Sequence, residues 1–237
     1  MISDALREEV WRANLELVRA GLVTLSFGNV SGIDRAAGAF VIKPSGVAYD
    51  SLRPHDLVVV SLEDGRTLAG DLRPSSDTPT HLKLYQAFPE IGGVVHTHSS
   101  YASAFSQAGR DIPCLGTTHA DHFRGSVPVS RPMSDDEVDG HYEAATGDVV
   151  VETIHSRGTD AVRMPAVLVR SHGPFTWGAD AASAVVNAVA LEAVAAMAHH
   201  TLTLDAAAAE VGAALLRRHF DRKHGPGAYY GQPGEGR

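Results

Sequence analysis

Two histidines, two positions apart, end a short apolar run in the segment GGVVHTHS, residues 92–99. If residues 93–98 form a β-strand, alternate side chains point the same way, so His96 and His98 face one space with backbones about 6.6 Å apart. Two imidazoles at that separation can converge on one ion, because Zn–N bonds are about 2.0–2.1 Å long. The spacing permits metal binding, although two polar residues at an ordinary strand end would show the same pattern.

A third histidine, His172, follows the apolar run MPAVLV by three positions and immediately precedes Gly173. Loops of this kind commonly present functional side chains. Three histidines with one open position are typical of catalytic zinc sites, whereas structural zinc sites are closed by four protein ligands. The chain has 13 histidines, so the residue type alone identifies no ligand, and a turn-capping role for His172 stays open. Together the three histidines favour a catalytic metal site.

Three short segments, SFGNVSG, KPSG and PSSD, combine glycine with hydroxyl, amide and ammonium groups. Backbone amides and hydroxyls at such loops can bind a phosphate, and Asp77, just before an expected helix, suits either a metal or a helix cap. Ordinary turns and caps remain alternatives for all three segments. The basic stretch RRHFDRKHG, residues 217–225, is explained by a helix end whose dipole favours positive charge.

The composition limits the classes of partner and compartment. A net charge of −8 argues against a broad nucleic-acid or anionic-membrane surface, because such surfaces use clustered lysine and arginine. Cys114 is the only cysteine, which excludes an intramolecular disulfide and cysteine-based zinc sites and is compatible with a reducing compartment. The N-terminus has no apolar signal-peptide core, and polar residues interrupt the alanine-rich stretch 181–198. We therefore expect a cytoplasmic protein that neither spans a membrane nor binds nucleic acid.

The hydrophobic patterns predict helices flanking a central sheet. Helices are expected at residues 4–20, 79–88, from about 99 to 108, 180–203 and 206–223, and strands at residues 25–32, 38–46, 57–65, 66–70, 93–98 and 164–173. The middle segment, residues 109–165, is expected to be rich in loops. Short connections in the first half favour antiparallel pairing, because parallel crossovers need a dozen or more residues. The predicted fold is a single α/β domain over residues 1–237, a three-layer α/β/α arrangement with a mainly antiparallel sheet.

Seven motifs in order, GNVSG, KPSG, PSSDTPTH, GGVVHTHS, GTTHADHF, SHGPFTWG and KHGPGAYYGQ, carry a resemblance to a known family. Over about residues 5–232 the chain resembles the L-ribulose-5-phosphate 4-epimerases of the class II aldolase/adducin family. The resemblance implies epimerisation of L-ribulose 5-phosphate to D-xylulose 5-phosphate at C4, in L-arabinose-type pentose catabolism. It also implies a homotetramer with active sites between subunits.

The resemblance further implies a role for each matching residue. A catalytic zinc ion, with Mn²⁺ as another candidate, would be bound by His96, His98, His172 and Asp77. The residues implied in substrate binding are Gly28, Asn29, Lys43, Ser45, Gly46, Ser75, Ser76, His219 and Arg222. Asp121 and Tyr230 would form the acid/base pair, with Tyr230, His219 and Arg222 supplied by a neighbouring subunit on which the tail from about residue 225 docks. The PGEGR extension runs beyond the family's YYGQ ending.

Chemistry favours a mechanism of bond cleavage for such a substrate. The C4 hydrogen of a 2-ketose is not α to the carbonyl, whereas cleaving C3–C4 leaves an enediolate that Zn²⁺ can stabilise. A sugar-phosphate aldolase, such as fuculose-phosphate aldolase, is the nearest alternative, but aldolase relatives carry Glu where this chain has Asp77 and lack the Asp121 motif. A non-catalytic, adducin-like structural module is a second alternative, against which the three histidines argue.

Overall fold

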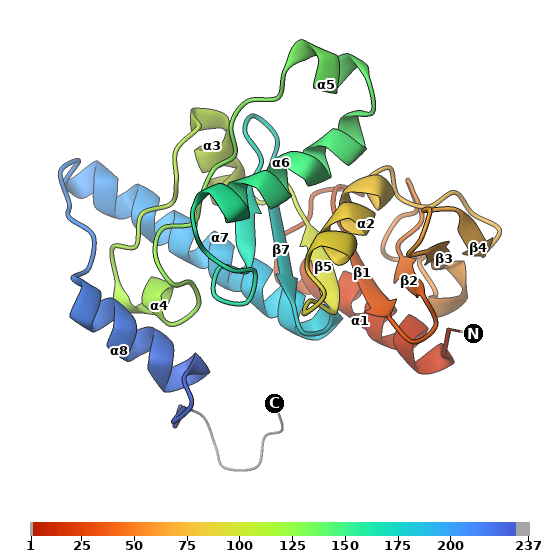
Figure 1. The fold of residues 1–237 in the computed structure, drawn as a ribbon, viewed down its shortest axis with the longest axis horizontal. Helices are drawn as coiled ribbons and strands as arrows, with labels where there is room; N and C mark the ends of the chain where they lie inside the picture. Colours follow the sequence, from red (N-terminus) through yellow and green to blue (C-terminus); the bar gives the residue numbers. More distant parts are fainter. Residues whose placement is uncertain (1, 231–237) are drawn as a thin grey trace.

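A computed structural model describes residues 2–230 of the chain, and its centre is one seven-stranded sheet (Figure 1). The strands are β1 (Asn29–Asp34), β2 (Ala39–Ile42), β3 (Val58–Ser61), β4 (Thr67–Ala69), β5 (Gly93–His96), β6 (Ala166–Leu168) and β7 (Pro174–Gly178). Their spatial order is β4-β3-β2-β1-β5-β7-β6, and every neighbouring pair is antiparallel. The prediction of a mainly antiparallel sheet is confirmed.

Helices cover both faces of this sheet (Figure 1). They are α1 (Asp4–Arg19), α2 (Thr78–Ala87), α3 (Ser100–Ala108), α4 (Thr117–Ala120), α5 (Asp135–Asp139), α6 (Tyr142–Ser156), α7 (Ala181–Leu204) and α8 (Ala213–His224), with a 3-10 turn at η1 (Pro54–Asp56). In β2, Phe40 and Ile42 join the core cluster that includes side chains of α2 and α6, whereas Val41 joins the cluster with α1 and the first half of α7. Alternate strand residues thus enter two separate cores, and the three-layer prediction is confirmed.

Helix α7 is long and apolar, yet it belongs to the core of the fold. Among the described residues it is the one helix whose length and composition would suffice to cross a membrane. Its buried side chains, including Val185, Leu191 and Val194, pack in the two core clusters beside β5 and β7. This packing is that of a core helix.

Several element boundaries differ from the sequence-based expectations. The strand expected from residue 25 begins only at Asn29, because Gly28 has a left-handed φ of 96° that interrupts extended backbone. The strand expected to reach residue 98 ends at His96. The last helix begins at Ala213 rather than at 206, and the Val211 N–H of the intervening segment donates to the Cys114 carbonyl instead. Local alanine content predicted a helix that tertiary contacts override.

Two elements near the site were not predicted. Helix α6 lies in the segment that was expected to be rich in loops. It was missed because Gly147 and the β-branched run of residues 149–151 weaken the helical pattern of the sequence. Gly147 instead lets α6 approach α2 closely, since a Cβ there would lie 2.6 Å from the Lys83 Cβ. Strand β7 was also missed, although its Phe175, Thr176 and Trp177 are strong strand formers.

Candidate active site

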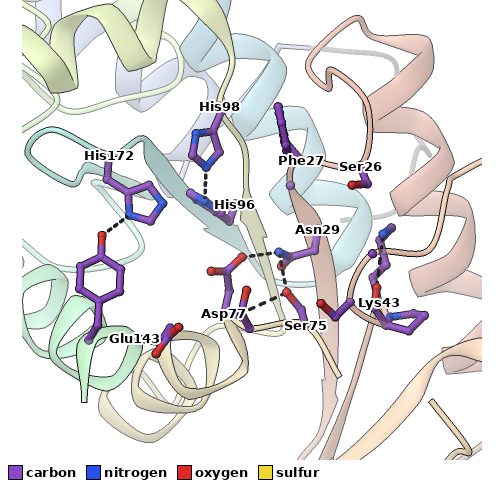
Figure 2. A pocket seen from close by; sticks show the side chains of 16 residues that line it. Ser26, Phe27, Asn29, Lys43, Ser75, Asp77, His96, His98, Glu143 and His172 are labelled. Carbon is purple, nitrogen blue, oxygen red and sulfur yellow. Dashed lines mark hydrogen bonds between the residues drawn. The ribbon is translucent and has the colours of Figure 1, made fainter. Parts of the chain in front are cut away.

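Three histidines from two chain segments meet at the end of β5 (Figure 2). His96 is the last residue of β5, His98 follows in the loop before α3, and His172 lies in the turn between β6 and β7. Their candidate ligand atoms all lie within 4.8 Å of one another, and the Nε2 atoms of His96 and His98 are 3.0 Å apart. The predicted cluster is present, although His98 reaches it from a loop and not from the same strand face.

Close backbone approaches position these rings. The loop before β1 passes so near β5 that a Cβ on Gly28 would lie 2.8 Å from the His96 carbonyl oxygen. Ser171, directly before His172, has a φ of 60°, a left-handed conformation that is unfavourable for residues other than glycine. Pairing of β5 with β7 places His96 opposite Phe175, whose ring stacks on the imidazole at 4.2 Å between centroids. The turn and the stacking together fix the directions of His172 and His96.

The protonation state of the histidines suits metal binding. His96 Nδ1 lies 3.0 Å from the Pro174 carbonyl oxygen, so Nδ1 carries the proton and Nε2 keeps a free lone pair toward His98. Burial, followed by the neighbouring imidazoles, lowers the pKa of His172 to about 4. Burial also lowers the pKa of His98. Neutral imidazoles are the form that binds divalent metals, so the donor set fits a divalent ion such as Zn²⁺.

Asp77 faces the histidine cluster from the start of α2 (Figure 2). It occupies the N-cap position, but its carboxylate accepts no capping hydrogen bond and instead accepts from Asn29 Nδ2 at 2.6 Å. Burial works against its charge, but the nearby imidazoles of His96 and His81 and the Asn29 amide outweigh burial and lower the Asp77 pKa. Asp77 is therefore an ionised carboxylate free of the ordinary capping role.

Three loops surround the remaining side of the site. Asn29 Nδ2 also donates to Ser75 Oγ at 3.1 Å, which connects the GNVSG and PSSD segments. The buried Lys43 turns its ammonium into its own loop, where Nζ donates to the Val47 carbonyl at 2.7 Å and lies 4.7 Å from the Tyr49 ring centroid. Desolvation lowers the Lys43 pKa to about 8. Lys43 thus braces the loop that carries Ser45 and Gly46.

These segments enclose a cavity of about 430 Å³ (Figure 2). Among the predicted residues its lining includes Gly28, Asn29, Lys43, Ser45, Gly46, Ser75, Ser76, Asp77, His96, His98 and His172. Ser26, Phe27, Tyr142 and Glu143 also line the cavity and were not predicted. Tyr142 Oη lies 3.3 Å from His172 Nδ1. No local pattern indicated Tyr142 and Glu143, because Gly147 and the valines at 149–151 weaken the helical signal of residues 142–156.

The other predicted residues gather elsewhere, between α4 and α8, and none of them lines the cavity. Arg222 binds the Asp121 carboxylate through two nitrogens, with Nε 2.9 Å from Oδ1, and His219 Nδ1 lies 3.0 Å from the same oxygen. The Arg222 guanidinium lies 4.9 Å from the centroid of the half-exposed Tyr230 ring. We call Asp121, His219, Arg222 and Tyr230 the α8 cluster. The predicted PGEGR extension lies outside the described residues.

The α8 cluster keeps its carboxylate charged. Burial would raise the Asp121 pKa, but hydrogen bonds from Arg222 and His219 outweigh burial and lower it. In this arrangement the Asp121 carboxylate is paired with two basic side chains. The basic end of α8 therefore does more than complement a helix dipole, since Arg222 pairs with a carboxylate 101 positions earlier in the chain.

Comparison with known proteins gives a consistent result. Residues 8–199 match the family model described as Class II Aldolase and Adducin N-terminal domain. The L-ribulose-5-phosphate 4-epimerases UlaF of Salmonella paratyphi C (strain RKS4594) and Salmonella choleraesuis (strain SC-B67) are each 52% identical over 227 residues, covering 96% of this chain and 98% of the relative.

Solved structures share the fold at lower sequence identity. An L-fuculose 1-phosphate aldolase superposes with a TM-score of 0.79 at 20% identity, covering 94% of this chain and 97% of that one. The L-fuculose-1-phosphate aldolase of Thermus thermophilus gives a TM-score of 0.67 at 24% identity, covering 86% and 100%. Together with the family model and the 52% identical relatives, these matches show that the chain belongs to the class II aldolase and adducin family.

Proposed function

We propose that this chain epimerises L-ribulose 5-phosphate to D-xylulose 5-phosphate at C4, with a divalent metal, zinc by preference, as its cofactor. The observation that carries the proposal is the meeting of His96, His98 and His172 beside Asp77, in a cavity lined by hydroxyl and amide groups. Epimerase relatives that are 52% identical over nearly the whole chain support this substrate. As a metabolic enzyme of L-arabinose-type pentose catabolism, it would act in the cytoplasm.

The reaction begins with loss of the proton on the C4 oxygen. The C3–C4 bond then breaks, its electron pair passes to the dihydroxyacetone fragment as an enediolate, and C4 becomes the aldehyde of glycolaldehyde phosphate. A bound divalent ion supplies Lewis-acid stabilisation of the negative charge on the fragment, worth several kcal/mol. After the aldehyde turns its other face, the same bond forms again with C4 inverted, and a proton returns to its oxygen.

The three loops would bind the phosphorylated fragment during these reaction steps. Glycolaldehyde phosphate must stay bound while its aldehyde rotates, because release would turn epimerisation into cleavage. Ser45, Gly46, Ser75 and Ser76 line the same cavity and offer hydroxyls and backbone amides that can bind the phosphate. Lys43, held inside its loop, keeps Ser45 and Gly46 in place and adds positive charge near the phosphate.

Inversion requires proton transfer at the C4 oxygen in two orientations, and we assign it to Asp121 and Tyr230. Asp121 accepts a proton as a carboxylate, and the Tyr230 phenol donates one. Both residues belong to the α8 cluster, outside the cavity of their own chain. We therefore propose a homotetramer in which the α8 cluster of one subunit, with the tail from residue 225, completes the cavity of the next.

A product assay tests the proposal directly. Purified enzyme loaded with Zn²⁺ and supplied with L-ribulose 5-phosphate is expected to form D-xylulose 5-phosphate with no net accumulation of fragments. Net dihydroxyacetone and glycolaldehyde phosphate would instead identify an aldolase. A chain that binds no divalent metal and leaves L-ribulose 5-phosphate unchanged would contradict both the epimerase and the aldolase and would favour a structural module. Parallel metal analysis of the purified protein distinguishes zinc from manganese.

A further inference from the structure

Beneath the candidate active site lies a buried polar chain that the proposed mechanism does not use. Ser31, His81 and Tyr85 are each 0% exposed. Ser31 Oγ lies 2.7 Å from His81 Nδ1 and 2.7 Å from Tyr85 Oη. Three polar side chains are unfavourable in a hydrophobic core unless they are hydrogen-bonded, so this chain calls for a specific explanation.

This hydrogen-bond chain forms because the side-chain spacing on helix α2 matches the spacing on strand β1. Helix α2 and its N-cap present Asp77, His81 and Tyr85 at intervals of four residues, about 6.0 Å of rise per interval. Strand β1 presents Asn29 and Ser31 two residues apart on one face, about 6.6 Å along the strand. The two repeats nearly coincide, so Asp77 meets Asn29 while His81 and Tyr85 both meet Ser31.

The proton positions along this chain can be assigned. Burial lowers the His81 pKa to about 3 and raises the Tyr85 pKa, so the imidazole is neutral with one N–H and the phenol keeps its proton. Ser31 has a single hydroxyl proton to give. Either Ser31 donates to His81 Nδ1, which leaves the histidine proton on Nε2 and makes Tyr85 the donor to Ser31, or His81 Nδ1–H donates to Ser31.

The charge of Asp77 decides between the two directions. With Nδ1 engaged by Ser31, Nε2 is the ring nitrogen left to interact with the Asp77 carboxylate one helical turn earlier. A lone pair there would repel the carboxylate, whereas an N–H would attract it. Two buried atoms of this layer also lack a protein partner among the described residues, His81 Nε2 and the acceptor Asn29 Oδ1, and an N–H on His81 is complementary to that acceptor.

We propose that His81 is a positioning residue of the metal site. A hydrogen-bond chain from Tyr85 through Ser31 fixes it as the tautomer protonated at Nε2, and that N–H, which makes no hydrogen bond among the described residues, attracts the Asp77 carboxylate electrostatically and so biases its position beside the three histidines. His81 also meets Phe175 edge-on at 6.0 Å between centroids, and Phe175 stacks on His96. The buried His81 ring thus acts on Asp77 directly and on His96 through Phe175. This role rests on the proposed metal site.

Nitrogen NMR of metal-free protein with ¹⁵N-labelled histidine tests the tautomer. We expect the wild-type His81 ring to be protonated at Nε2, and we expect Ser31→Ala or Tyr85→Phe to weaken that preference. A wild-type ring protonated at Nδ1 overturns the proposal. This measurement does not depend on metal binding, so it stays informative if the proposed function fails.

Zn²⁺ affinity, measured by competition with a chromophoric chelator, tests the positioning role. His81→Asn keeps a polar atom for Ser31 but removes Nε2, and we expect about a tenfold loss of affinity, as is typical when an outer partner of a metal ligand is removed. His81→Gln can return a donor near Nε2 and should lose less. Unchanged affinity in folded His81→Asn overturns the proposal, whereas a wild-type protein that binds no Zn²⁺ contradicts the proposed function instead.

His119→Asn is the matched control. His119 is also buried, at 3% exposed, bonds one ring nitrogen to the Gly125 carbonyl at 2.8 Å and leaves Nδ1 without a protein partner among the described residues. It lies on α4, outside the lining of the cavity. We expect His119→Asn to lower the unfolding free energy in urea as His81→Asn does, while its Zn²⁺ affinity stays at the wild-type value. An equal loss of affinity in both variants would reveal a general loosening of the fold and overturn the positioning role.

Discussion

The histidine cavity and the α8 cluster are both charged sites, but they are organised differently. In the cavity, three imidazoles and several hydroxyls line open space, and the Asp77 carboxylate accepts a hydrogen bond from a single amide. In the α8 cluster the Asp121 carboxylate already has Arg222 and His219 as partners, and Tyr230 lies half exposed at its edge. The cavity has the features of a site for substrate and metal, and the α8 cluster those of a preassembled acid/base group.

This contrast explains why neither region alone would carry all the groups that the proposed epimerisation needs. The cavity includes no group from the α8 cluster in its lining, and the α8 cluster has no histidine triad among the described residues. The proposed active site between subunits of a closed ring would bring both together. The variants below separate the two regions, beginning with the largest expected effect.

The largest effect is expected from His98→Ala in the cavity. It removes one of the three proposed imidazole ligands, and because His98 is exposed, truncation leaves no buried void. We expect bound Zn²⁺ and epimerase activity to fall by more than about a hundredfold, since losing even an outer partner typically costs 10- to 100-fold. Metal analysis and turnover measure both losses. The control is His199→Ala, an exposed histidine of α7, and an active, metal-loaded His98→Ala protein would refute the assignment.

The next effect is expected from Tyr230→Phe in the α8 cluster. The phenyl ring can keep its place over Arg222 while the ionisable hydroxyl is lost. We expect turnover to fall by about 10²- to 10⁴-fold, the usual contribution of general acid–base groups, with Zn²⁺ affinity unchanged. Asp121→Asn should behave alike but also weaken the Arg222 ion pair. Loss of metal from Tyr230→Phe would show that the two regions are not independent.

Mixing the two kinds of variant tests the shared site. Co-expressed His98→Ala and Tyr230→Phe chains are each almost inactive alone. If the α8 cluster serves a neighbouring cavity, about a quarter of the sites in random mixed tetramers combine two intact halves, and activity should return to about that fraction. If each chain completes its own cavity, no mixture regains activity.

Acid should destabilise the metal-free protein because three histidines, one beneath the cavity and two beside the α8 cluster, have lowered pKa values. Burial lowers the pKa of His81 to about 3 and of His119 and His122 to about 4. The folded values lie below the unfolded value near 6.5, so this stability is complete above pH 6.5 and is lost as pH falls toward 4 and then 3. The buried His81 and His119 each contribute up to about 1.4 kcal/mol per pH unit in that window, and the partly exposed His122 contributes less because solvent screens its charge.

Urea unfolding at several pH values, with a chelator present, measures this slope. His119→Asn should reduce the slope of unfolding free energy against pH, because it removes one buried imidazole beside the α8 cluster. Added Zn²⁺ should raise stability most near neutral pH and progressively less in acid, because protons compete for the ligand histidines. A slope that stays flat from pH 7 to pH 4.5 would contradict the buried neutral histidines.

The sequence predicted the cavity better than its surroundings, for physical reasons. Residue types that bind metals are few, so His96, His98 and His172 could be selected by type, spacing and neighbouring glycine. Strands with clear apolar runs, such as β3, were also predictable. Helix α6 was not, because Gly147 and three adjacent valines have poor helix propensity, and its packing against α2 stabilises it instead.

Long-range polar pairing was the least predictable feature. Asp121 and Arg222 are separated by 101 positions, and no local pattern indicates that they meet. The family resemblance assigned both to the active site, but the lowered pKa of Asp121 follows only from three-dimensional contacts. The same holds for the meeting of Ser31 with His81, which depends on the register of α2 against β1.

The smallest effect is expected from Tyr142→Phe, a cavity-lining residue at the start of α6. Its hydroxyl lies 3.3 Å from His172 Nδ1, a long and therefore weak contact that can still orient the imidazole. We expect Zn²⁺ affinity to fall by about three- to tenfold. The matched control is Tyr101→Phe, whose hydroxyl lies 3.5 Å from His200 Nε2 away from the cavity and whose loss should leave affinity unchanged. If Tyr142→Phe also leaves affinity unchanged, the turn at Ser171 alone orients His172, and the cavity's metal ligands need no support from α6.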